Sequence, residues 1–247
     1  MRDQFPSEGS ALKRYAARFD AVEINSSFHR PHRRTTYERW AASVPAAFRF
    51  AVKLPKAITH ERRLVESAEP LARFAEEVGG LGGKRGPVLV QLPPSLAFDA
   101  ELADSFFGRL GETLPGRVAC EPRHPSWFTA AADALLIAHA VARVAADPAR
   151  VPGAAEPGGW RGLTYARWHG SPAIYRSSYD ETAIEAHAAV ARTAGESWTM
   201  YDNTTLGAAT ANALALQAGL ASGRKQKGQV DPSGDWSNPS SSAATWS

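Results

Sequence analysis

The chain has 247 residues, which allows one large α/β domain or two small ones, and its 44% hydrophobic and 21% charged residues are ordinary for a globular protein. The net charge of +3 is dispersed and gives only weak support for nucleic acid as a partner. No window approaches the roughly 18 uninterrupted apolar residues of a membrane span. One cysteine, Cys120, excludes an intramolecular disulfide, and residues 1–6 lack the apolar core of a signal peptide, which together favour the cytoplasm.

Strand-like apolar runs, each closed by polar residues, recur along the chain. They span residues 21–28, 48–54, 87–92, 118–123, 142–147, 163–169 and 198–203. Helical patterns separate most of them, at residues 36–43, 67–78, 101–110, 131–140, 180–194 and 206–220. The repeated order of strand then helix predicts a parallel sheet with crossover helices.

Two architectures fit this order, a doubly wound open sheet and a (β/α)₈ barrel. An open sheet concentrates its functional groups at a single switch point, whereas a barrel brings the carboxyl end of every strand to one mouth. Here polar side chains close every predicted strand: Glu23, Asn25, Lys53, Gln91, Glu121, Arg123, Asp147, His169, Asp202 and Asn203. The pattern therefore predicts an α/β fold of the TIM (β/α)₈-barrel type.

Two segments interrupt the pattern. Residues 148–162 are rich in Pro and Gly and predict an extended loop instead of a crossover helix. From residue 222 onward Ser, Gly and Pro dominate and apolar periodicity is lost. We therefore expect residues 1–221 to form the barrel-like domain and residues 222–247 to form a disordered tail.

Six motifs occur in a consistent order between about residue 5 and residue 220. They read RFDAVEINSSFHR, FRFAVKLPKAITHERRL, VLVQLPPSL, EPRHPSW, RWHGSPAIYRSSYD and YDNTTLGAATANALAL. Together they resemble the DUF72 family, the YecE-like proteins. The resemblance implies a TIM-barrel-like fold, and it leaves the activity open because the function of that family is undetermined.

The chain departs from the family pattern in two places. The family's usual first strand, ending in a Gly-Thr-Ser/Ala-Gly-Trp motif, has no counterpart before Phe5, and Pro122 replaces an aliphatic residue. A barrel closes because every strand edge is paired. Loss of one member would leave strands 21–28 and 198–203 with unpaired edges that favour aggregation. We expect either a truncated, weakened barrel or a natural start farther upstream.

The catalytic candidates are Glu23, Glu121 and His169. A carboxylate pair with split pKa values can act as general acid and base, and a histidine in a tight turn can shuttle protons. The competing interpretation is that Glu23 and Glu121 form ion pairs with Arg30 and Arg123. Both interpretations are consistent with the sequence.

Lys53, Arg123 and Arg30 place positive charge at the expected mouth, which suits a phosphate or carboxylate ligand. Polar and aromatic side chains complete the predicted substrate-binding set: Asn25, Gln91, His124, Trp127, Asp147, Trp168, Asp202 and Asn203. No HExxH or CxxC spacing is present, so the identity of any metal ligands is unknown. A protein without a cofactor and a protein with a divalent metal are both compatible with these residues.

These residues favour an acid/base enzyme of the hydrolase or lyase type, acting on a small polar or anionic substrate at the mouth of the barrel. The alternative is a non-catalytic module that binds a ligand, nucleic acid or protein through the same basic and aromatic groups. Salt-dependent binding of single strands would favour the alternative.

Overall fold

The computed structural model describes residues 4–227 and 241–246. Its strands are β1 (Ala21–Ile24), β2 (Arg49–Lys53), β3 (Arg85–Gln91), β4 (Val118–Glu121), β5 (Val141–Arg143), β6 (Ala145–Asp147), β7 (Gly158–Gly159), β8 (Leu163–Trp168), β9 (Glu196–Tyr201) and β10 (Ser241–Trp246). The α-helices are α1 (Ala11–Ala16), α2 (Ser26–His29), α3 (Arg34–Ala42), α4 (Ala68–Val78), α5 (Ala100–Thr113), α6 (Ala130–Ala138), α7 (Glu181–Ala191) and α8 (Ala208–Lys227). Short helical turns span Ala57–Glu61, Gly79–Lys84 and Pro125–Trp127.

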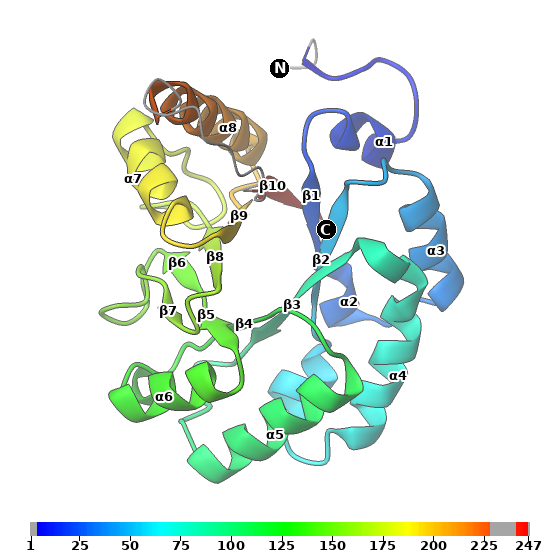
Figure 1. Cartoon of the computed structure of the whole chain (residues 1–247), viewed down its shortest axis with the longest axis vertical. Coiled ribbons are helices and arrows are strands. Elements are labelled where there is room, and N and C mark those ends of the chain that lie inside the picture. Colours follow the sequence, from blue (N-terminus) through cyan, green and yellow to red (C-terminus); the bar gives the residue numbers. More distant parts are fainter. Residues whose placement is uncertain (1–3, 228–240, 247) are drawn as a thin grey trace.

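The predicted α/β organisation with a mostly parallel sheet is confirmed. The strands follow the order β6-β8-β9-β10-β1-β2-β3-β4-β5-β7, and among the described strands only the short β5–β7 pair is antiparallel. Val144 alone separates β5 from β6, so the chain links β6, at one end of this order, to β5, the last strand but one at the other end. The strands consequently surround a common centre, with the helices outside them (Figure 1). We call this arrangement the strand ring.

The inside of the strand ring is filled by a cluster drawn almost entirely from strands. Small residues from neighbouring strands, including Ala21, Ala51 and Ala119, leave space that large side chains of β8 and β9 occupy. Trp198 is one of these, and it lies so close to Gly86 that a Cβ there would approach its ring to 2.4 Å. Close packing of large against small residues thus fixes the interior.

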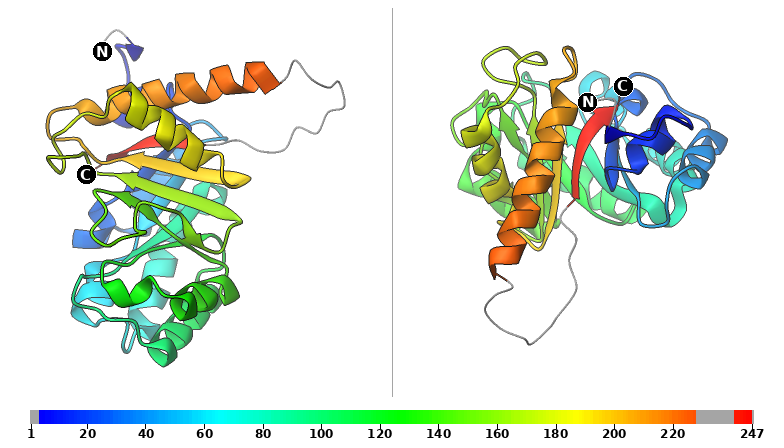
Figure 2. Two further views of the ribbon diagram at one scale, coloured as in Figure 1. Left: turned by 90° about the vertical axis from the view of Figure 1, so that its left-hand side faces the viewer. Right: turned by 90° about the horizontal axis from the view of Figure 1, so that it is seen from above.

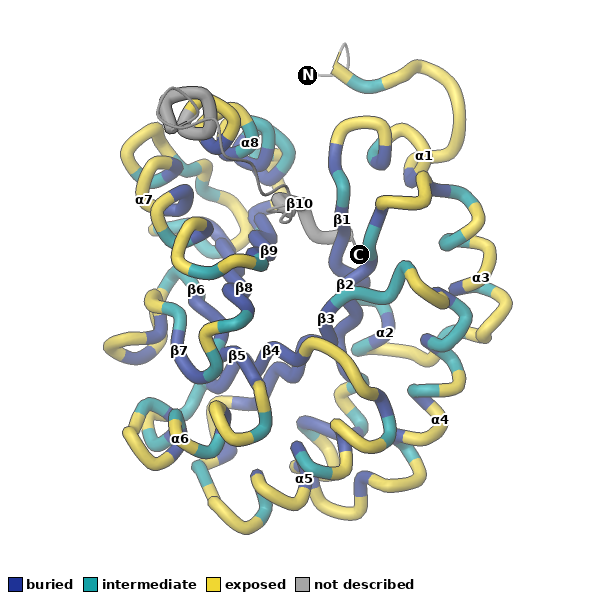
Figure 3. Tube along the Cα trace, in the orientation of Figure 1, coloured by how far each residue is buried: buried dark blue, intermediate teal, exposed yellow. Residues whose placement is uncertain are grey.

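The outward-facing side chains of the same strands pack against the helices. Phe50, Val52 and Val90 belong to one large cluster with Phe74 of α4 and Phe106 of α5. Asp99 accepts a hydrogen bond from the backbone N–H of Leu102 and so caps the start of α5. Figure 3 shows the result, in which strands β1 to β4, β8 and β9 are largely buried and the exposed residues lie on the outer helices and loops.

The C-terminal segment differs from the expected tail. Helix α8 continues to Lys227, and β10 lies between β9 and β1, parallel to both. Its register pairs Ser241 with Trp198 and Thr245 with Glu23. Figure 2 shows this strand in red. The position between β9 and β1, where the sequence predicted a missing strand, is therefore occupied by the C-terminal strand β10. Residues 228–240 and 247 of the expected tail lie outside the described residues.

The physical reason is that two strands with open edges make a strong template for a third. An isolated segment of small and polar residues has little strand signal of its own, but its backbone can satisfy the N–H and C=O groups of both neighbours. The expected disorder is thus not confirmed for residues 222–227 and 241–246.

Within residues 4–227 and 241–246, no helix is both long and apolar enough to cross a membrane.

Candidate functional site

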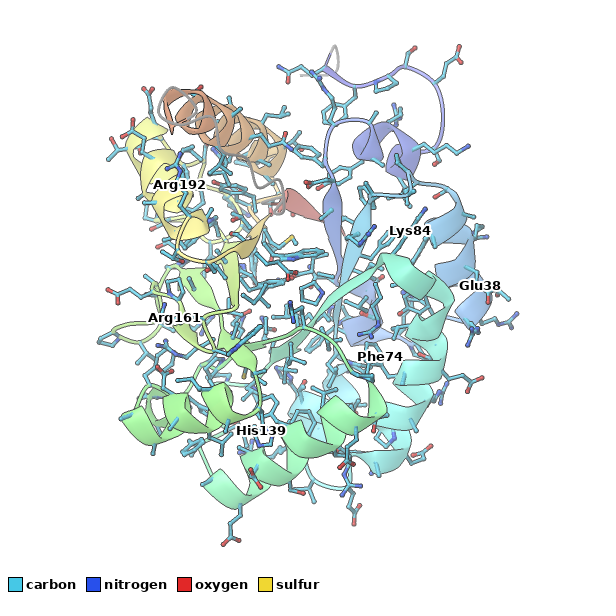
Figure 4. The ribbon with its side chains drawn as sticks, viewed as in Figure 1. Glu38, Phe74, Lys84, His139, Arg161 and Arg192 are labelled. Carbon is cyan, nitrogen blue, oxygen red and sulfur yellow. The ribbon has the colours of Figure 1, made fainter. Side chains whose placement is uncertain are left out.

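Alternation along the strands places a second, polar layer on top of the apolar interior. The side chains two residues beyond the inward-facing Ala21, Ala51, Leu89, Ala119 and Tyr165 point to the same side. They are Glu23, Lys53, Gln91, Glu121 and Arg167, none more than 8% exposed. We call these five residues the charged layer. Figure 4 shows side chains filling the space that the strand ring encloses.

Arg167 is the centre of the charged layer. Its Nη2 donates to Glu23 Oε1 at 2.8 Å and its Nε donates to Glu23 Oε2 at 3.1 Å, which makes a bidentate pair. Its Nη1 donates to Glu121 Oε2 at 2.7 Å, and Nη2 also reaches Asp202 Oδ2 at 3.3 Å. One guanidinium therefore joins carboxylates from β1, β4 and the end of β9.

Further donors surround the two glutamates. Tyr165 donates its hydroxyl proton to Glu23 Oε2 at 2.6 Å, and Gln91 Nε2 donates to Glu121 Oε2 at 2.9 Å. Arg123 donates to Glu121 Oε1 from Nε at 3.1 Å and from Nη2 at 2.9 Å. Burial would raise the pKa of Glu121, but the charges of Arg167 and Arg123 outweigh it and hold the pKa well below its usual value. A carboxylate kept ionised in this way is a poor proton donor.

His169 lies beside the charged layer and is oriented by Asp202. Its Nδ1–H donates to Asp202 Oδ2 at 3.0 Å. The other ring nitrogen, Nε2, lies 3.4 Å from Arg167 Nη1 and 3.9 Å from Glu121 Oε1. With the proton on Nδ1, Nε2 carries the lone pair that a general base uses. His169 is 5% exposed, so the pair is shielded from bulk water.

A small cavity opens next to these groups. It has a volume of about 20 Å³, and its lining includes Glu121, Arg123, Arg150, His169 and Tyr175. Arg150 and Tyr175 are exposed, whereas Arg123 keeps 18% of its side chain accessible. The cavity wall thus combines an exposed arginine, Arg150, and a partly exposed one, Arg123, with the buried Glu121.

The family model described as a protein of unknown function, DUF72, matches residues 3–235. The chain belongs to the DUF72 family. The UPF0759 protein YecE of Escherichia coli K12 is 27% identical over 121 residues, which cover 48% of this chain and 43% of YecE. The match therefore spans less than half of that relative.

Two solved DUF72 structures share the fold. The Thermotoga maritima protein superposes with a TM-score of 0.71 at 22% identity, covering 87% of this chain and 92% of that one. The Enterococcus faecalis protein gives a TM-score of 0.75 at 19% identity, covering 96% and 94%. At these identities the likeness concerns the fold alone, so the chemistry rests on this chain's residues.

In this DUF72 chain the structure brings most of the predicted polar residues together. Around Arg167 it gathers Glu23, Gln91, Glu121, Arg123, His169 and Asp202, and Lys53 completes the charged layer. Arg30, the expected partner of Glu23, is exposed and borders a different cavity beside α2 and α4. The partner of Glu23 is instead Arg167.

The two tryptophans of the predicted substrate-binding set, Trp127 and Trp168, are buried away from the charged layer. Trp127 is 1% exposed, donates from Nε1 to the carbonyl of Leu96 at 3.0 Å, and packs on Phe98. Trp168 points away from Arg167 into the helix layer, where its ring stacks on His187 at a centroid distance of 4.1 Å. Alternation explains the second case, because successive strand residues face opposite sides.

Three other predicted residues, Asp147, His124 and Asn203, form hydrogen bonds that organise loops near the charged layer. Asp147 accepts the hydroxyl proton of Tyr179 at 2.7 Å, and His124 Nδ1 lies 2.8 Å from Ser126 Oγ. Asn203 donates to the carbonyl of Ser177 and to Asn212 Oδ1, each at 2.8 Å. Asn25 precedes α2, and its buried Oδ1 accepts no hydrogen bond from the described residues.

Sequence reasoning missed Arg167. The signal was available, because Tyr165, Arg167 and His169 alternate with apolar residues and so share one face of β8 and its continuation.

For metals, the described residues contain no group of three or more His, Cys, Asp and Glu placed to hold an ion.

Proposed function

We propose that this DUF72 protein is a (β/α)₈-barrel enzyme that performs acid/base chemistry on a small anionic substrate at the mouth of the barrel. In this account β5 and β6 count as one strand of the barrel, and β10 supplies the eighth. The order of the strands and the link through Val144 support the closed form. The polar groups at the carboxyl ends of the strands lie where barrel enzymes carry their active sites.

His169 is the general base in this proposal, and the observation that carries it is the 3.0 Å hydrogen bond from its Nδ1 to Asp202. That bond fixes the ring, whose Nε2 accepts a hydrogen bond from Arg167 Nη1 at 3.4 Å, and His169 lines the small cavity together with Glu121. Removal of a proton from water or from a carbon acid opens hydrolase and lyase reactions alike. In this proposal Glu121, which stays ionised, holds Arg123 and Arg167, and Glu23 pairs with Arg167.

Arg123 supplies the anion contact. Its guanidinium is anchored on one side by Glu121 and keeps part of its surface at the cavity. A planar guanidinium held in this way suits a carboxylate or phosphate oxygen. Arg150, on the same cavity wall, adds a second positive charge.

The expected result of His169→Asn is a loss of turnover by about 10²–10⁴-fold, the usual contribution of a positioned acid/base group. The measurement incubates a cellular small-molecule extract with wild type or variant and follows the disappearance of anionic metabolites by mass spectrometry. His139→Asn is the matched control, because His139 also pairs with a carboxylate, Asp104 at 2.8 Å, but on the outer helices (Figure 4).

Wild type and His139→Asn should consume the same metabolites, and His169→Asn should leave them intact. Equal consumption by all three proteins, or consumption by none, contradicts the enzyme proposal. If a metabolite is retained unchanged by wild type and by His169→Asn alike, the non-catalytic binding module is the better account.

A further inference from the structure

Lys53 differs from the other lysines whose contacts the structure describes. It follows the inward-facing Ala51 at the end of β2, is 8% exposed, and holds Nζ 4.0 Å from the centre of the Phe28 ring. Lys56 pairs with Glu61 at 3.2 Å, and Lys84 donates to the carbonyls of Ala41 and Val44. Within residues 4–227 and 241–246, no carboxylate lies in ion-pair distance of Lys53.

The surroundings of Lys53 favour the uncharged amine. Burial lowers its pKa to about 8, and Arg167 and Arg123 act in the same direction against the opposing charges of Glu121 and Glu23. About a tenth of the side chain is therefore a free amine at pH 7, whereas an ordinary lysine is almost fully protonated. A desolvated amine next to other cations is the arrangement that makes lysine a nucleophile.

We infer that Lys53 forms an imine with the carbonyl carbon of a small ketone or aldehyde whose carboxylate or phosphate group is bound by Arg123. The inference rests on the proposed function, for which it names the substrate class. Two observations support it: among the described residues the buried amine has no ion-pair partner, and Arg123 keeps 18% of its side chain accessible beside the small cavity.

The chemistry balances with the groups named. The lone pair of Lys53 Nζ attacks the carbonyl carbon, and a C–N bond forms as the carbonyl π bond breaks. Both amine protons then leave with the carbonyl oxygen as water, which yields C=N. Protonation of that nitrogen gives an iminium ion, an electron sink that stabilises the carbanion left when a base removes a neighbouring proton or breaks a carbon–carbon bond.

The test is reductive trapping on the full chain. Wild type is incubated with sodium cyanoborohydride and, separately, pyruvate, dihydroxyacetone phosphate or acetone, where the reductant delivers hydride to the C=N carbon. Intact-mass and peptide-mass analysis should show one adduct per chain on Lys53. An anionic probe should react at least tenfold faster than acetone, and the faster of pyruvate and dihydroxyacetone phosphate tells whether the site prefers carboxylate or phosphate.

Lys53→Arg should abolish this adduct, and Lys84→Arg, the matched control at a half-buried lysine, should keep it. An adduct spread over surface lysines, or no adduct with either anionic probe, overturns the inference. Peptide mapping of wild type locates the adduct even where a variant fails to fold. Turnover that depends on His169 without any Lys53 adduct leaves the proposed function standing and removes only the imine.

Discussion

Ending the chain after Ser240 is expected to abolish cooperative unfolding or to lower the free energy of unfolding by several kcal/mol. The deletion removes β10, which pairs with Glu23 and Ile24 of β1 and with residues 198–201 of β9. Each backbone hydrogen bond contributes about 1 kcal/mol net, and a whole domain is stable by only about 5–15 kcal/mol. Loss of one strand that joins two others is therefore comparable with the total stability.

Chemical denaturation followed by circular dichroism measures this effect, with a chain lacking only Ser247 as the control. A synthetic peptide of residues 241–246 added to the shortened chain should restore part of the lost stability, because β10 pairs through its backbone with both neighbours. A shortened chain that unfolds at the same denaturant concentration as the full chain would show that β10 does not close the ring.

Arg167→Met is expected to lower the free energy of unfolding by about 3–5 kcal/mol, the usual effect of leaving a buried charge without its partner. The substitution leaves Glu23, which is 0% exposed, without its arginine partner. It also removes one of the two arginines that pair with Glu121. Arg117→Met is the matched control, because Arg117 pairs with Glu196 on the surface, with 51% of its side chain exposed. Its loss should cost about 0–1 kcal/mol.

The effect of Arg167→Met should depend on pH. The pKa of Glu121 lies well below its unfolded value in the native protein, so its ion pairs add stability that is complete above the unfolded pKa and is lost as pH falls through the folded pKa. In the variant that pKa rises. Urea denaturation should therefore show a smaller difference between wild type and variant at pH 3, below the unfolded pKa, than at pH 7.5. Equal costs for Arg167→Met and Arg117→Met would contradict a central role of Arg167.

Much of the site follows from the two-residue period of the strands. Lys53, Gln91 and Glu121 end β2, β3 and β4, and Glu23 is the last residue but one of β1. Parallel strands bring such residues to one end of the sheet. The same two-residue period places the side chains of Arg167 and Trp168 on opposite faces of β8. Choosing between those two required knowing which face of β8 is inside, and the large Tyr165 in the interior decides it.

The strand β10 had no comparable signal. Its sequence, SSAATW, is short and mostly small or polar, and it pairs because the edges of β1 and β9 lie on either side. Such pairing depends on contacts between residues far apart in the chain, which local patterns do not report. The pairing of Glu23 with Arg167 is missed for the same reason, since 144 positions separate them.

The central claim is that the charged layer holds a buried, reactive amine among ionised groups at the mouth of the strand ring. A pH titration of the Lys53 side chain tests it most directly, by NMR on protein labelled at lysine Cε and assigned as the resonance missing from Lys53→Arg. We predict a midpoint at a pKa of about 8. A midpoint near the ordinary value of 10.5 would contradict the account.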